Sequence, residues 1–172
     1  MTKAQAAFIA TLAPAAQQAQ KEFGIPASIT IAQAILESGW GKTRLAADYN
    51  NFFGIKQVDG EDSAYVAFAT HEYIRGAYEV VNAKFAWYRT PADCFRAHSW
   101  LLGRKRYTPA MAALPSLTEC TKRLGPEDAK ENPKGCGYST NPKYGEVLME
   151  LIGEFGLTEY DAPGPNEPAK AA

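Results

Sequence analysis

The sequence predicts a mainly helical α+β domain in which two lobes enclose a cleft and the smaller lobe is one β-hairpin. Segments with apolar residues at helical spacing lie on both sides of the middle of the chain. Between them, residues 64–74 and 77–88 are rich in Tyr, Val and Phe and are joined by Arg75-Gly76, a pattern typical of a hairpin. With 172 residues, 46% of them hydrophobic, the chain can bury a core as one compact domain.

Caps and apolar spacing justify the helical segments in order. Thr2 can cap a first segment, Pro14 can restart it, and Gly24 can end it. Residues 26–37 follow with apolar side chains at helical spacing. This segment is expected to end at Ser38-Gly39-Trp40-Gly41, where two glycines can terminate the helix. Four more helices are expected: from Thr90-Pro91 to about Leu102, from Thr108-Pro109, from the capping box Ser116-Leu117-Thr118-Glu119, and from Pro142 to Gly156.

The domain is expected to cover residues 1–158, with a flexible tail over residues 159–172. The end of the chain contains Pro163-Gly164-Pro165 and Pro168 and has little apolar surface to bury. A segment of this composition gains too little from burial to offset the entropy that ordering costs.

Composition excludes several function classes. The net charge is −1, from 18 basic and 19 acidic side chains, so we expect no nucleic-acid groove, which would require a basic excess. No stretch approaches the ~20 consecutive apolar residues of a membrane span. The N-terminus lacks the basic region and the apolar block of a secretory signal peptide. We expect a monomer that is made in the cytoplasm.

The three cysteines leave two interpretations open. The segment between Cys120 and Cys136 is rich in Gly and Pro, so it can turn back and allow a disulfide between them. Alternatively, all three cysteines are small apolar core residues, as Cys94 is expected to be. Cys94 and His98 lie four residues apart on a predicted helix, which fits a packed helix face better than a nucleophile pair. Neither histidine has metal-ligand spacing, and the sequence predicts no metal and no organic cofactor.

Glu37 is the first candidate for catalysis. It lies in the last turn of the apolar helix predicted over residues 26–37, where the helix dipole disfavours a further negative charge. Its neighbours Ile35, Leu36 and Trp40 would add a desolvation cost on the ionised form. Both effects raise the pKa of a carboxyl group, as a general acid that protonates a glycosidic oxygen requires. The alternative is a solvated surface glutamate.

Glu72 is the second candidate, because glycoside hydrolysis usually needs two carboxylates. It lies near the tip of the predicted hairpin, and Thr70, Glu72 and Ile74 share one face of the strand. The alternative is a polar residue on a solvated hairpin face.

Aromatic side chains could line a saccharide groove, because the apolar faces of sugar rings stack on them. This group comprises Trp40, Phe52, Phe53, Tyr65, Tyr73 and Tyr138. About half of such residues are expected in the core instead.

The run Ala32–Gly41, which contains Glu-Ser-Gly-Trp-Gly, is followed by Asn50–Lys56, and together they resemble bacterial peptidoglycan N-acetylglucosaminidases of glycoside hydrolase family 73. That family includes the hydrolase domain of flagellar rod-cap proteins and many autolysins. The resemblance continues through His71-Glu72-Tyr73, Phe85–Leu102 and Gly137–Tyr144, and it covers roughly residues 3–156. The segment from Cys120 to Cys136 is longer than is usual in the family.

The resemblance implies a lysozyme-like fold and an endo-β-N-acetylglucosaminidase that cuts peptidoglycan after N-acetylglucosamine. It implies that Glu37 is the general acid, that Glu72 is the second carboxylate, and that Tyr138 positions the substrate or the acid. Asn51 and Phe53 would shape the cleft, where Trp40 and Tyr73 could also bind substrate. A muramidase or lytic transglycosylase on the same fold, and a non-catalytic glycan-binding module, are the alternatives.

The substrate lies in the periplasm or cell wall, so the route of delivery needs an explanation. Three routes remain open: a toxin injected into rival bacteria, a phage endolysin, and a domain cut from a longer protein. We favour an antibacterial toxin, which would be accompanied by an immunity protein that fills the cleft.

Overall fold

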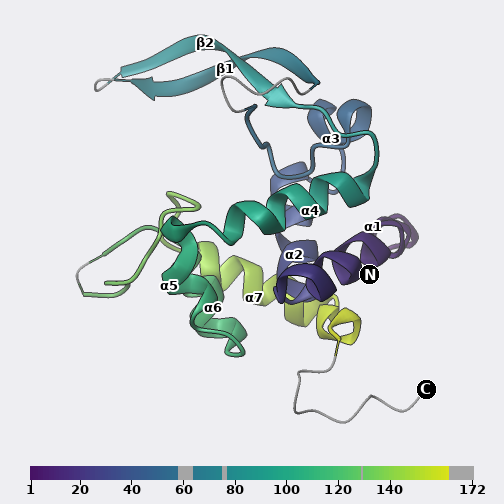
Figure 1. Ribbon diagram of the computed structural model, residues 1–172, viewed down its shortest axis with the longest axis vertical. Coiled ribbons are helices and arrows are strands. Elements are labelled where there is room, and N and C mark those ends of the chain that lie inside the picture. The colour runs from purple at the N-terminus through teal and green to yellow at the C-terminus, as the bar shows by residue number, and fades with distance from the viewer. Residues whose placement is uncertain (58–63, 75–76, 129, 163–172) are drawn as a thin grey trace.

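The computed structural model describes residues 1–57, 64–74, 77–128 and 130–162, with the backbone alone for residues 70–74 and 77–79. It is mainly helical with one two-stranded antiparallel sheet, as the sequence predicts. In Figure 1, the sheet lies at one end of the molecule, and α4 crosses between it and the remaining long helices. The elements are α1 (Lys3–Phe23), α2 (Ala27–Ser38), α3 (Arg44–Tyr49), β1 (Tyr65–Ile74), β2 (Ala77–Ala86), α4 (Pro91–Leu102), η1 (Lys105–Tyr107), α5 (Thr108–Met111), α6 (Leu117–Leu124), α7 (Tyr144–Glu154) and η2 (Leu157–Tyr160).

Helix α1 is one continuous helix, so the prediction that Pro14 restarts it is wrong. Proline already has a helical φ, and burial of one face of α1 offsets the hydrogen bond that Pro14 cannot donate. The two ends agree with the prediction. Thr2 and Gln5 form a capping box, and Gly24 ends the helix with φ 75°.

Helix α2 is the centre of the core. Ten of its twelve residues are buried, and it packs against α1, α7 and η2. A helix that is apolar on nearly all sides can be stable only when other elements surround it. Glu37, the residue before the last of α2, is therefore carried on an element that is held from several sides.

The segment Ser38-Gly39-Trp40-Gly41 turns the chain sharply after α2. Gly39, Trp40 and Gly41 all have positive φ, at 54°, 62° and 73°. The Ser38 hydroxyl accepts a hydrogen bond from the Gly41 N–H at 2.8 Å. A Cβ at Gly41 would lie 2.7 Å from the ring of Phe8, so this position has no room for a side chain.

The predicted β-hairpin is confirmed, with pairing that runs from Tyr65 opposite Ala86 to Ile74 opposite Ala77. The turn Arg75-Gly76 lies outside the described residues. The base of the hairpin is tied to the preceding loop, because the Ala86 N–H donates to Ile55 O at 2.9 Å and Lys56 bridges to Phe85.

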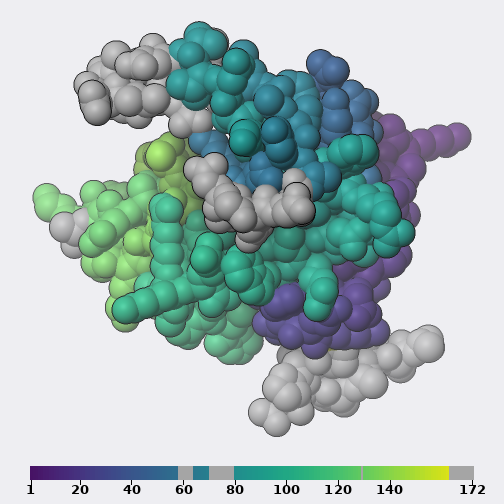
Figure 2. All heavy atoms as spheres, turned by 45° about the horizontal axis from the view of Figure 1, so that its top comes forward, coloured from purple at the N-terminus to yellow at the C-terminus, as the bar shows by residue number. Residues whose placement is uncertain are grey.

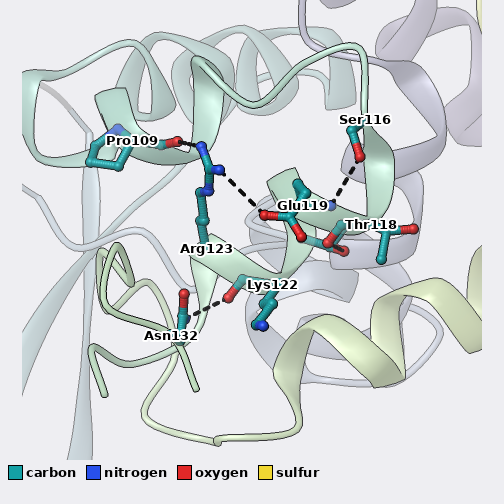
Figure 3. A network of polar contacts seen from close by, with 8 residues as sticks. Pro109, Ser116, Thr118, Glu119, Lys122, Arg123 and Asn132 are labelled. Atoms are coloured by element: carbon teal, nitrogen blue, oxygen red, sulfur yellow. Dashed lines mark hydrogen bonds and ion pairs between the residues drawn. The ribbon is translucent and has the colours of Figure 1, made fainter. Parts of the chain in front are cut away.

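The predicted capping box at the start of α6 is only half formed. Ser116 Oγ accepts a hydrogen bond from the Glu119 N–H at 3.3 Å, but the Glu119 carboxylate pairs with Arg123 Nη2 at 3.3 Å. Arg123 also donates to Pro109 O at 3.0 Å, and Asn132 Nδ2 donates to Lys122 O at 2.8 Å (Figure 3). These bonds join α5 and α6 to the loop that leads to Tyr138.

All three cysteines are free, buried thiols, so the Cys120–Cys136 disulfide, one of the two interpretations that the sequence leaves open, is not formed in this structure. The Cys136 thiol donates to Arg123 O at 2.9 Å, and Cys120 is fully buried in the core. Burial raises the pKa of both thiols, to about 12 for Cys120, which keeps them protonated. The structure therefore agrees with the interpretation of small apolar core residues.

The folded structure continues past position 158 through η2. The Asp161 carboxylate accepts hydrogen bonds from the N–H and the hydroxyl of Ser28, at 2.7 and 2.8 Å. This places a negative charge at the N-terminus of α2, where the helix dipole favours it. Residues 163–172 lie outside the described part of the chain. No helix among the described residues is long and apolar enough to cross a membrane.

Candidate active site

A cavity of about 1210 Å³ lies between the base of the hairpin, α4 and the C-terminal end of α2. Figure 2 brings the sheet end of the molecule toward the viewer and shows the coloured base of the hairpin and α4 on the same face. The walls come from segments far apart in the sequence: Glu37, residues 53–57, residues 86–88, one face of α4, residues 104, 106 and 107, and residues 138–140. A cavity of this size can hold several sugar rings.

Glu37 lies in the wall of this cavity at the end of a hydrogen-bonded chain. The Tyr144 hydroxyl donates to Glu37 Oε1 at 2.9 Å, and Gln33 Nε2 donates to the Tyr144 oxygen at 3.1 Å. Gln33 is fully buried one turn before Glu37 on α2, and Tyr144 is the first residue of α7. The amide therefore fixes the direction of the hydroxyl, and the hydroxyl fixes one oxygen of the carboxyl group.

Two effects act on the pKa of Glu37 in opposite directions. Desolvation of the carboxyl group in the cavity raises its pKa, and the hydrogen bond from Tyr144, which stabilises the carboxylate, lowers it. Desolvation is the larger effect, so the pKa of Glu37 lies above its ordinary value. A carboxylic acid with a raised pKa keeps its proton to a higher pH, which is the property a general acid needs.

Tyr138 lines the same cavity and contacts Tyr144, with ring centroids 5.7 Å apart. Its hydroxyl lies 3.1 Å from His98 Nε2. The loop before it is held by Arg106, which donates to Cys136 O at 2.9 Å and to Gly137 O at 2.6 Å. The ring of Tyr138 is therefore held from both sides, by a buried histidine and by an anchored loop.

His98 is fully buried on α4 and stacks on Phe53, with ring centroids 3.8 Å apart. Burial lowers the pKa of His98 to about 3, so its ring is neutral near neutral pH. Burial also raises the pKa of Cys94 to about 12. A buried, protonated thiol is a poor nucleophile, and Cys94 and His98 form a packed helix face as predicted.

The residues that the sequence singles out for substrate binding fall into different places. Phe53 lines the cavity, whereas Trp40 packs edge-to-face on Phe155, at 4.9 Å between centroids. Asn51 is buried and donates through Nδ2 to Ile55 O and Ala86 O, at 2.9 and 2.8 Å. Asn51 thus joins the loop to the base of the hairpin, and neither it nor Trp40 is among the residues that line the cavity.

Glu72 and Tyr73 lie on β1, where Glu72 pairs with Glu79 and Tyr73 with Tyr78 in the strand register. Their side chains lie outside the described part of the structure. Their roles as second carboxylate and as substrate contact therefore stay predictions.

Sequence reasoning misses four residues of this site. In the sequence, Tyr144 is only one member of an apolar stripe, and its contact with Glu37 joins positions 107 apart. Trp87 and Trp100 line the cavity with exposed fractions of 51% and 53%, high for the largest apolar side chain. Arg104 lies beside Trp100. The sequence does not show that Trp87 and Trp100 are exposed, because a tryptophan has the same local pattern whether its side chain faces the core or a cavity.

Among the described residues, no group of three or more His, Cys, Asp or Glu side chains could hold a metal ion.

The comparisons with known proteins indicate one family of peptidoglycan hydrolases. The glucosaminidase family described as "Mannosyl-glycoprotein endo-beta-N-acetylglucosaminidase" matches residues 13–157. The exo-glucosaminidase LytG of Bacillus subtilis is 33% identical over 168 residues, 94% of this chain and 55% of that protein. A probable N-acetylmuramidase of Lactococcus lactis subsp. cremoris is 32% identical (93% of this chain, 36% of that protein), and the peptidoglycan hydrolase FlgJ of Escherichia coli is 31% identical (85% and 45%).

The chain spans about a third to a little over half of the length of these relatives. Among solved structures, the catalytic domain of the autolysin Auto from Listeria monocytogenes superposes with a TM-score of 0.76 at 27% identity. The match covers 94% of this chain and 89% of that one. With a family match over most of its length and a shared lysozyme-like fold, the chain belongs to the glucosaminidase family of glycoside hydrolases, family 73.

Proposed function

We propose that this protein is an endo-β-N-acetylglucosaminidase that cuts the glycan strands of peptidoglycan after N-acetylglucosamine, with Glu37 as the general acid. The observation that carries the proposal is the environment of Glu37. Its carboxyl group opens into a cavity of about 1210 Å³, its pKa is raised by desolvation, and one of its oxygens is held by Tyr144. Membership in the glucosaminidase family supports the type of glycosidic bond that is proposed to be cut.

The chain of donors assigns a role to each carboxyl oxygen. Because Gln33 donates to the Tyr144 oxygen, the Tyr144 hydroxyl hydrogen is directed to Glu37 Oε1. Oε1 is then an acceptor, and the acidic proton is carried on Oε2. From Oε2 the proton passes to the glycosidic oxygen as the bond to the sugar breaks, and positive charge develops on the ring.

Two groups are candidates for completing the reaction at the positively charged ring. Glu72 could activate a water molecule, or the 2-acetamido oxygen of the substrate could attack the ring carbon. Replacing Glu72 with Gln distinguishes them. A loss close to that of a Glu37 variant supports the carboxylate, whereas a milder loss together with inhibition by a thiazoline mimic of the cyclised intermediate supports the acetamido group.

Glu37→Gln is expected to reduce hydrolysis of purified sacculi by at least about 100-fold, because glutamine keeps the shape and cannot donate the proton. Glu154→Gln is the matched control, since Glu154 also ends a helix and is exposed but does not line the cavity. Release of reducing ends measures the rate. Wild-type turnover by Glu37→Gln would contradict the assignment.

The bond that is cut distinguishes the proposal from its nearest alternative. Three relatives from Lactococcus lactis are named probable N-acetylmuramidases, which favours a muramidase as the second candidate. Mass spectrometry of digested and borohydride-reduced glycan decides between them. A reduced N-acetylglucosamine end supports the glucosaminidase, and a reduced N-acetylmuramic acid end, or an anhydro end, supports the muramidase or the lytic transglycosylase.

The site of action is proposed to be the periplasm or cell wall, in keeping with relatives named as peptidoglycan hydrolases. The role as an antibacterial toxin with an immunity protein in the cleft is a further proposal. Expression in Escherichia coli with and without an added export signal tests it. Lysis only with export, and not with Glu37→Gln, would support a toxic activity on the cell wall, and growth of both strains would contradict it.

A further inference from the structure

One face of α4 forms a wall of the cavity. The cavity-lining residues of this helix recur three and four positions apart, the spacing of side chains that share a helix face. They are Asp93, Arg96, Ala97, Trp100 and Leu101, and Arg104 continues the series just past the helix end. Glu37 lines the same cavity, so a ligand along this wall would be continuous with one at the acid.

Trp100 and Arg104 form an ordered pair on this wall. The guanidinium carbon of Arg104 lies 4.8 Å from the centre of the Trp100 ring, which is 53% exposed. A guanidinium that is stacked on an indole loses part of its conformational freedom in advance but keeps the N–H groups at its edge. Such a pair presents a preorganised set of donors to a planar anion such as a carboxylate.

The cavity lining is cationic although the chain as a whole has a net charge of −1. The basic residues that line the cavity are Lys56, Arg96, Arg104 and Arg106, and the acidic ones are Glu37 and Asp93. An excess of positive charge in a cleft attracts anionic ligands.

Two of these arginines are already engaged. Arg96 pairs with Glu22 at 2.8 Å, and Arg106 donates to the carbonyl groups of Cys136 and Gly137. Arg104 pairs with no acidic side chain within the part of the chain that the structure describes. Arg104 is therefore the arginine of the wall best placed to bind an external anion.

We propose that Trp100 and Arg104 form a subsite for a carboxylate carried by the glycan strand, so that the enzyme selects anionic over neutral glycans. The inference rests on the proposed function. In peptidoglycan, every second sugar bears a lactyl ether whose carboxyl group is either free or joined to a peptide with carboxylates of its own. Either source offers a carboxylate to Arg104, whereas a neutral β-1,4 glycan carries no carboxylate.

The test compares three soluble substrates: peptide-bearing strands, the same strands with their carboxylates amidated, and strands stripped of peptide. Arg104→Gln is expected to raise KM about 3- to 10-fold with kcat within about twofold, the size of one charge-assisted contact that is partly exposed. The rise is expected on peptide-bearing strands if a peptide carboxylate binds, and on stripped strands if the free lactyl carboxylate binds. The effect should disappear on amidated strands. Lys105→Gln is the matched control, because Lys105 is the next cation along the chain and does not line the cavity.

The stripped strands identify the source. A KM effect found only on stripped strands, where the lactyl carboxylate is free, assigns that carboxylate, and one found only on peptide-bearing strands assigns the peptide carboxylates. Arg104→Lys should recover part of the affinity, because it restores the charge without the planar group. An unchanged KM for Arg104→Gln on both peptide-bearing and stripped strands, or an equal rise on amidated strands, would overturn the subsite while wild-type activity leaves the proposed function intact. A wild-type protein that cuts none of the three would overturn both.

Discussion

At the scale of single residues, the site depends on how one carboxyl group is held. Desolvation raises the pKa of Glu37, and the hydrogen bond from Tyr144 lowers it. The acid strength of Glu37 therefore depends on the balance of these two opposing effects. Gln33 makes this possible because its buried amide occupies the Tyr144 oxygen and leaves the hydroxyl hydrogen for Glu37. Tyr144 lies 107 positions from Glu37 in the sequence, so the two meet only when α7 packs against α2.

Tyr144→Phe is expected to shift the alkaline limb of the pH–rate profile to higher pH. Without the hydroxyl, the carboxylate loses a stabilising donor, so the pKa of Glu37 rises and the acid stays protonated further up the pH scale. The maximal kcat should fall about tenfold, because the carboxyl group is no longer oriented. Tyr160→Phe, in η2, is the control. An alkaline limb that moves to lower pH would contradict the role given to Tyr144.

At the scale of elements, the turn after α2 joins the acid to the rest of the core. The Glu-Ser-Gly-Trp-Gly run uses its glycines for backbone geometry and its tryptophan for packing. Trp40 lies against Phe8 of α1 and Phe155 after α7, with centroids 5.8 and 4.9 Å apart. The turn therefore fixes the end of α2, and Glu37 with it, against both the first helix and the last.

Gly41→Ala and Gly39→Ala distinguish two reasons for glycine in this turn, which are the positive φ and the close approach of the Phe8 ring. Both glycines have positive φ, so an alanine costs roughly 1–2 kcal/mol at either position. Only Gly41 also faces the Phe8 ring, which would lie 2.7 Å from the added methyl group, so Gly41→Ala should cost about 1–3 kcal/mol more. Urea unfolding measures the difference. Equal losses for the two variants would show that the Phe8 contact does not limit the position.

At the scale of the whole molecule, the cavity lies where the hairpin base, α2, α4 and the Tyr138 loop converge. His98 is a polar residue buried at this junction, with Phe53 from the loop before the hairpin on one side and Tyr138 on the other. Its Nδ1 has no hydrogen-bond partner among the described residues. Charging this ring inside the core is therefore costly, and the stability of the molecule depends on the ring staying neutral.

His98 is expected to make the protein sensitive to acid. Its folded-state pKa is about 3 against an ordinary value of 6.5, so between these pH values the unfolded chain binds a proton that the folded chain does not. Lowering the pH through this window therefore favours unfolding, by up to about 1.4 kcal/mol for each pH unit. Urea unfolding of wild type and His98→Gln between about pH 4 and 7 tests it, since groups common to both proteins cancel. Parallel pH dependences would contradict the prediction.

The local features of this protein follow from its amino-acid sequence alone. Helix ends at Thr2, Gly24 and Thr90, and the hairpin of residues 64–88, follow from residues within a few positions of one another. The position of Glu37 at the end of an apolar helix was predictable for the same reason. Caps, turns and periodicity act over one or two turns of chain, and so they can be read before the chain is folded.

The residues that surround Glu37, in contrast, are brought together by packing between distant parts of the chain. Tyr144 reaches Glu37 across 107 positions, Asn51 and Trp40 serve packing away from the cavity lining, and Trp100 is turned toward the cavity. The cysteines show the same limit, because a segment rich in Gly and Pro between Cys120 and Cys136 allows a bridge but does not require one. These outcomes depend on how α2, α4 and α7 pack, and side chains of one type have the same local signals whether they face the core or the substrate.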